Sequence, residues 1–168
     1  MTITPCDAPD AASPPVCVEA LILRHEPIRG LAYRRLMRGL GTNISPDRTA
    51  RLLARLHDGD ERHLVHSTSW RAAGDGRIVL TYLVHPDPDQ ESPATPLPNP
   101  PVIARSPSPG TPSPPGLAIG HVASHAVRHL VFLGRTDPVV AAHLAAWPGT
   151  RRALEGMPGM AAGELPRC

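Results

Sequence analysis

The alternation of apolar and polar residues predicts a β-hairpin near the middle of the chain. Two strand-like runs, 63–71 and 77–85, flank the turn sequence Ala-Ala-Gly-Asp-Gly. One possible register pairs residues whose two sequence numbers add up to an even number. In that register, one face of the hairpin carries Leu64, His66, Thr68, Trp70, Ile78, Leu80, Tyr82 and Val84. This register would place Trp70 in the core and would leave His66 and Thr68 in need of hydrogen-bond partners.

Apolar residues spaced three or four positions apart predict helices around this hairpin. One such stripe, Ile28, Leu31, Ala32 and Leu36, predicts a helix over 28–38. Ser45, Pro46 and Asp47 are typical of a helix N-terminus and predict a helix over 46–57. Its buried stripe would consist of Thr49, Leu52, Leu53 and Leu56. The longest helix is predicted over 117–133, and shorter helices follow Asp137 and Thr150. The run 16–23 fits either a buried strand or the first turns of a helix.

Residues 86–115 differ in composition from the rest of the chain, since 12 of these 30 residues are proline. Proline interrupts both helices and strand ladders, and the remaining residues are mostly small and polar. Such a segment buries too little apolar surface to offset its ordering entropy. We therefore expect a disordered, solvated insertion at 86–116.

Together these elements predict an α+β fold. A small antiparallel sheet would centre on the β-hairpin, and three or four helices would cover it. A chain of 168 residues has room for one domain. We place this single domain at 16–156, interrupted by the insertion. Residues 1–15 are predicted to form a disordered N-terminal tail, and residues 157–168 a flexible C-terminal tail.

All 17 basic residues are arginine, although the net charge is only +2. Eight arginines lie in the span 24–55 against two carboxylates, and two helices joined there could suggest a helix-turn-helix. The loop between the two predicted helices is long for that motif, and aromatic residues that could stack on bases are scarce. Absence of lysine also indicates codon bias, which inflates the arginine count. Nucleic-acid binding through Arg-rich helices in 24–55 is therefore disfavoured and kept as a second alternative.

The ends of the chain and its cysteines favour a soluble, cytoplasmic protein. The N-terminus has neither a basic region nor an apolar core typical of a secretory signal. No apolar run reaches the roughly 20 residues that a membrane span needs. The three cysteines form no Cys-x-x-Cys pair and indicate neither a disulfide framework nor a zinc knuckle. We expect no membrane association.

Histidines spaced four residues apart form the most regular chemical pattern in the chain. His121, His125 and His129 would lie in one stripe on the longest predicted helix. Two histidines at this spacing can share a metal ion, so zinc or another transition metal is a possible cofactor. The three together span about 12 Å of helix rise, so one ion would need ligands from elsewhere. Alternatively, the histidines are packed or line a groove.

The hairpin offers a second group of polar side chains, of which His66, Thr68 and Arg71 are candidate ligand-binding residues. Arg71, together with the serines on the same strand, could donate hydrogen bonds to an anion or to the backbone of a partner protein. No Gly-x-Ser-x-Gly elbow is present, which argues against a serine hydrolase. The leading hypothesis is a non-enzymatic interaction or regulatory module. It would bind a protein or small molecule in a groove lined by the histidine stripe and the hairpin. A metal-dependent enzyme or metal-binding protein using a histidine pair is the first alternative.

Overall fold

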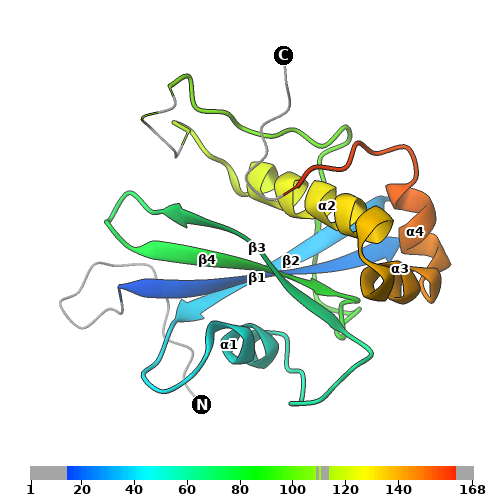
Figure 1. Cartoon of the computed structure of the whole chain (residues 1–168), viewed down its shortest axis with the longest axis horizontal. Helices are drawn as coiled ribbons and strands as arrows, with labels where there is room; N and C mark the ends of the chain where they lie inside the picture. The colour runs from blue at the N-terminus through cyan, green and yellow to red at the C-terminus, as the bar shows by residue number, and fades with distance from the viewer. Residues whose placement is uncertain (1–14, 109, 111–113, 162–168) are drawn as a thin grey trace. The chain divides into compact units, whose positions relative to one another are not determined.

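The computed structural model describes residues 15–108, 110 and 114–161. Within these residues the fold is α+β, as predicted, with an open sheet and accompanying helices (Figure 1). The elements in chain order are β1 (Val16–Glu26), β2 (Gly30–Gly39), α1 (Pro46–Leu53), β3 (Leu64–Ala72), β4 (Ile78–His85), β5 (Thr95–Pro96), α2 (Ile119–Thr136), α3 (Pro138–Ala145) and α4 (Pro148–Leu154).

The strand order is β3-β4-β1-β2-β5, and the sheet is mixed rather than wholly antiparallel. The predicted hairpin is present, because β3 and β4 pair antiparallel. β1 instead pairs parallel with β4, from Val16 opposite Ile78 to Ile22 opposite Val84. Parallel strands need a crossover connection. Here α1 and β3 lie between β2 and β4 in the chain, which allows β4 to run alongside β1 in the same direction.

The helix predicted over 28–38 is wrong, because this segment forms the turn after β1 and most of β2. The turn covers residues 27–29, and Gly30 follows it with φ of 77°, a conformation that glycine adopts without strain. Ile28 is 98% exposed in the turn, whereas Leu31, Ala32 and Tyr33 are buried in succession. A strand buried on both faces explains the apolar spacing that resembled a helical stripe.

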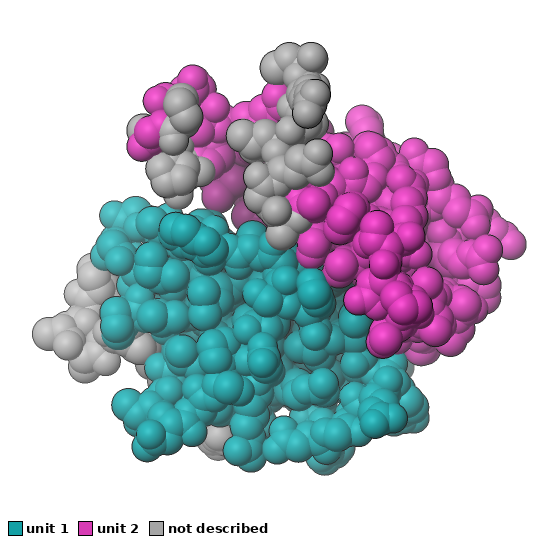
Figure 2. All heavy atoms as spheres, viewed as in Figure 1, with its two compact units in different colours: residues 1–23, 34–93 teal, residues 24–33, 94–168 magenta. Residues whose placement is uncertain are grey.

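The chain divides into two compact units, drawn in teal and magenta in Figure 2. Unit 1 comprises residues 1–23 and 34–93, and unit 2 comprises residues 24–33 and 94–168. Unit 1 therefore holds most of β1 and β2 together with α1, β3 and β4. Unit 2 holds β5 and helices α2 to α4. The single domain expected at 16–156 stays a prediction.

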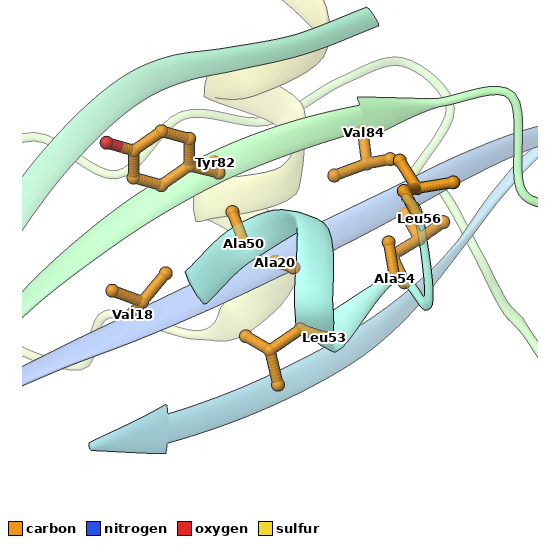
Figure 3. Packing of buried hydrophobic residues seen from close by; sticks show 9 residues of the cluster. Val18, Ala20, Ala50, Leu53, Ala54, Leu56, Tyr82 and Val84 are labelled. Carbon is orange, nitrogen blue, oxygen red and sulfur yellow. The ribbon is translucent and has the colours of Figure 1, made fainter. Parts of the chain in front are cut away.

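Alternate residues of β1 build the core of unit 1 beneath α1 (Figure 3). Val18, Ala20 and Ile22 point to one face of the sheet, and β4 adds Tyr82 and Val84. Ala50 and Leu53 of helix α1 cover this face, together with Ala54 and Leu56, which follow the helix. Ser45 caps the helix by accepting the Arg48 N–H at 3.2 Å, as its position in the sequence predicts. The helix ends at Leu53, and Leu52 is partly exposed rather than part of the buried stripe.

A β-bulge decides which side chains share a face of the hairpin. From Leu64 to Ser67, the sequence numbers of the two residues in each cross-strand pair add up to an odd number. From Ser69 onward they add up to an even number, so the register changes between these residues. Thr68 is the extra residue between these registers. His66 therefore pairs with Leu83, whereas Trp70 pairs with Leu80 as the even register requires. The placement of Trp70 in the core is wrong, because its side chain is 63% exposed.

The proline-rich insertion is more ordered than its composition indicates. Asp87 is buried near its start, and Leu97 is buried beyond β5. β5 pairs with β2 through Thr95 and Pro96, and the Leu97 N–H donates to the Leu31 carbonyl at 2.8 Å. Disorder is thus the wrong expectation for residues 86–97. Proline is tolerated here because β5 is an edge strand.

Several predictions about the ends of the chain fall on undescribed residues. The N-terminal tail predicted at 1–15 lies outside the described residues except for residue 15, as do residues 162–168. Cys17 is fully buried and disulfide-bonded. Within the described ranges, no helix combines the length and apolarity needed to cross a membrane.

Candidate functional site

The three hairpin residues predicted to bind a ligand already have partners or are half-buried in unit 1. The Thr68 hydroxyl is buried at the bulge and donates to the Thr81 carbonyl at 3.2 Å. His66 is half-buried opposite Leu83. Arg71 donates twice to the carboxylate of Glu19, at 2.7 and 2.8 Å. Thr68 and Arg71 therefore help to hold the sheet together.

Glu19 is the centre of a charged network on the sheet face opposite α1. Its carboxylate is fully buried and also accepts the Arg35 Nε at 2.7 Å and the Thr81 hydroxyl at 3.1 Å. Burial alone would raise the pKa of Glu19. The hydrogen bonds and charges of Arg71, followed by those of Arg35, outweigh burial and place the pKa below its usual 4.5. Glu19 is therefore ionised at neutral pH and links four strands.

A second polar cluster joins Tyr82 to α1 and β3. Burial, followed by hydrogen bonding to the Asp47 carboxylate, raises the pKa of Tyr82 to about 12. A phenol with this pKa keeps its proton near neutrality and acts as a donor, while Ser67 lies within hydrogen-bond reach of it. Tyr82 cannot serve as a general base for Ser67. The hairpin therefore lacks an activated serine at this position.

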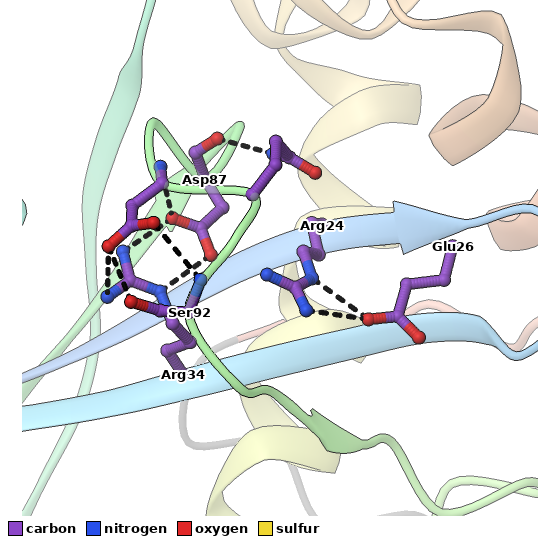
Figure 4. A network of polar contacts seen from close by, with 7 residues as sticks. Arg24, Glu26, Arg34, Asp87 and Ser92 are labelled. Carbon is purple, nitrogen blue, oxygen red and sulfur yellow. Dashed lines mark hydrogen bonds and ion pairs between the residues drawn. The ribbon is translucent and has the colours of Figure 1, made fainter.

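Most arginines of the span 24–55 form ion pairs or hydrogen bonds with other groups of the protein. Together with the strand in this span, these contacts remove the structural basis of the helix-turn-helix hypothesis. Arg34 makes a bidentate pair with Asp87 at 2.6 and 2.8 Å, and it lies 3.6 Å from Asp89 (Figure 4). In unit 2, Arg24 donates twice to Glu26 at 2.8 and 3.0 Å. Residues 30–39 form a strand, so no pair of consecutive helices exists there.

The histidine stripe lies on α2, and each histidine has a different environment. His121 Nδ1 accepts the Ala118 N–H at 3.2 Å and so helps to cap the helix. His129 is buried, with Nδ1 3.3 Å from the Met160 carbonyl and its ring stacked on Phe132. His125 lies between them, and its buried Nδ1 has no hydrogen-bond partner. Burial, followed by the charges of His129 and Arg128, lowers the pKa of His125 below 6.5.

Residues 157–160, which we call the strap, lie along α2 rather than forming a flexible tail. The Met160 N–H donates to the Arg128 carbonyl at 3.0 Å, and Arg128 Nε donates to the Pro158 carbonyl at 3.1 Å. A Cβ on Gly159 would lie 3.0 Å from the Phe132 backbone nitrogen, so a side chain there would push the strap away. The strap therefore covers the His129 end of the stripe.

We expect His129→Ala to destabilise the protein by about 1–3 kcal/mol, because it leaves the Met160 carbonyl without this partner. His125→Ala is the matched control on the same helix face. Because His125 Nδ1 makes no hydrogen bond, its loss should cost clearly less. Urea denaturation of both variants measures the difference. Equal losses would contradict a structural role specific to His129.

A metal centre finds no support among the residues that the structure describes. These residues contain no group of three or more His, Cys, Asp or Glu side chains that could hold an ion. His121 and His129 have the separate partners given above. The zinc hypothesis for the stripe stays a prediction from spacing alone.

A pocket of about 420 Å³ lies in unit 2 among α2, α3 and α4. Its volume falls in the range of small-ligand sites. The residues that line it are Val131, Gly134, Arg135, Ala141, Leu144, Arg151, Leu154, Glu155 and Gly156. Val131, Leu144 and Leu154 are buried, one on each of the three helices, and form an apolar floor. The packing of these helices therefore determines the shape of the floor.

Charged side chains surround the apolar floor of this pocket. Arg135 closes the last turn of α2 and donates one N–H to the Met157 carbonyl at 3.0 Å. Arg151 on α4 lies 3.7 Å from Glu155, and both side chains are more than half exposed. This distance is too long for a good hydrogen bond, so the pair is loose. Two guanidinium groups against one carboxylate give the pocket a net positive charge.

No local sequence pattern marks these pocket residues. Arg135 and Arg151 lie in different helices, separated by a turn and a further helix, and no motif connects them. Comparisons with protein-family models, with curated proteins and with solved structures find no significant match.

Proposed function

We propose that this chain is a non-enzymatic binding module whose ligand site is the pocket among α2, α3 and α4. The observation that carries the proposal is the combination of a buried apolar floor with two guanidinium groups that line the same pocket. Small-ligand sites typically combine an apolar lining with a few polar groups that orient the ligand. A small molecule suits this volume better than an extended polymer does.

The choice of binding over catalysis rests on the side chains that line the pocket. They offer two arginines and one glutamate, but no serine, cysteine or histidine. Nucleophilic catalysis needs a nucleophile within hydrogen-bond reach of a base. Arginine and glutamate can orient a charged ligand without such a pair. A regulatory role would follow if ligand binding altered Arg135, which also holds the strap at Met157.

A cytoplasmic location stays a prediction from the sequence. Ligand binding in the pocket is independent of the location.

We expect Ala141→Phe to abolish ligand binding, because Ala141 lines the pocket and its larger replacement would fill it. Ala142→Phe is the matched control, since Ala142 is an exposed neighbour on α3 outside the pocket lining. The probes are hexanoate, 1-hexanol and inorganic phosphate at millimolar concentration. Chemical-shift changes in the amide NMR spectrum report binding. Failure of all three probes to shift resonances of α2 to α4 would refute the proposed function.

A further inference from the structure

We infer that the pocket in unit 2 takes a small amphipathic monocarboxylate. The carboxylate would lie between Arg135 and Arg151, and its apolar tail would lie on the floor. This inference rests on the proposed function and names the ligand class.

The donors around the pocket favour a carboxylate. A guanidinium group has five N–H donors in a planar fork that matches two carboxylate oxygens. Arg135 uses one of these donors on the Met157 carbonyl, so donors remain for a ligand. Arg151 is held only loosely by Glu155, at 3.7 Å, and a ligand oxygen at hydrogen-bond distance would compete well with it.

The charge of the pocket favours a monoanion over a dianion. Glu155 lines the same pocket as the two arginines, so its negative charge opposes a second ligand charge. A phosphate group carries more charge and has no apolar part for the floor. The ligand should therefore combine one negative charge with a hydrocarbon segment.

The floor favours an apolar tail because three buried side chains meet there. Val131, Leu144 and Leu154 are each about 5–6% exposed and belong to different helices. A hydrocarbon tail placed against them would remove its own apolar surface from water, because the three side chains are themselves already almost fully buried. A Cβ on Gly134 would lie 2.8 Å from Leu144 Cδ1, so glycine at this position lets Leu144 approach α2 and form part of the floor.

Four single variants test the ligand class with hexanoate as the probe. Arg135→Gln and Arg151→Gln should each weaken hexanoate binding by about tenfold, the loss expected for one charge-assisted contact. Glu155→Gln should tighten it by about threefold, because it removes a like charge near the ligand. Arg152→Gln is the matched control, since Arg152 is exposed on α4 but does not line the pocket. Its affinity should equal that of the unmodified protein.

The comparison of probes separates this inference from the proposed function. Hexanoate should bind at least about tenfold more tightly than 1-hexanol or inorganic phosphate. If 1-hexanol binds as tightly and Ala141→Phe blocks it, the pocket is a ligand site but the carboxylate class is wrong. If phosphate binds best, the apolar part of the inference is wrong. An equal loss in Arg151→Gln and Arg152→Gln would also overturn it, because only general surface charge would then matter.

Discussion

Glu19→Gln should lower the free energy of unfolding by about 3–5 kcal/mol, the usual cost of removing one partner from a buried ion pair. The substitution keeps the size of the side chain but removes the charge that Arg71 and Arg35 share. Both arginines would then lie beside a neutral amide, although Arg35 is partly exposed and can turn toward water. Equilibrium denaturation in guanidinium chloride measures the loss.

The pH dependence of stability tests the same network. Because the folded pKa of Glu19 is lowered, its contribution is complete above the unfolded pKa, near the usual 4.5. The contribution is lost as the pH falls through the lowered folded pKa. The difference between the unmodified protein and Glu19→Gln should therefore shrink below about pH 4.5. The exposed Glu61→Gln serves as control and should show almost no difference at any pH.

Leu130→Ala should cost about 2–5 kcal/mol, because it removes a fully buried side chain and leaves a cavity. Leu130 is 1% exposed in the middle of α2, the longest helix described. The alanine favours the helix itself, so the loss would come from packing. Thermal and urea denaturation both measure it.

Leu52→Ala on α1 is the control for this prediction. Leu52 is 39% exposed, so the same chemical change should remove far less buried surface and cost clearly less. Equal losses in the two variants would show that the burial of Leu130 in α2 does not determine its contribution.

Elements with strong local signals could be predicted from the sequence. Ser45 and Pro46 mark the start of α1, because a side-chain acceptor and a preset φ act within one turn. Alternating apolar residues and a glycine-rich turn predict the β3–β4 hairpin. The periodicity of residues 117–133 likewise predicts α2, which extends over Ile119–Thr136. In each case, neighbours along the chain provide most of the information.

The predictions were wrong for elements whose structure depends on residues far away in the chain. Apolar spacing over 28–38 fits a helix, but residues 31–33 are buried on both faces of a strand. Thr68 is an extra residue that changes the register of β3 against β4. No residue type in the hairpin predicts this β-bulge. The order of residues 86–97 depends on Arg34 and Leu31, which lie more than fifty residues away.

The α+β class, the hairpin and the positions of α1 and α2 could be predicted from capping and periodicity, because both act over a few residues. The partners of the polar side chains could not be predicted in this way, because they come from other parts of the fold. His129 lies within hydrogen-bond distance of the Met160 carbonyl, and Arg71 donates to Glu19, so these two side chains help to hold the fold together. The pocket exists because three helices bring Arg135 and Arg151 to one apolar floor. Such convergence depends on how three consecutive helices pack on one another, which local patterns do not encode.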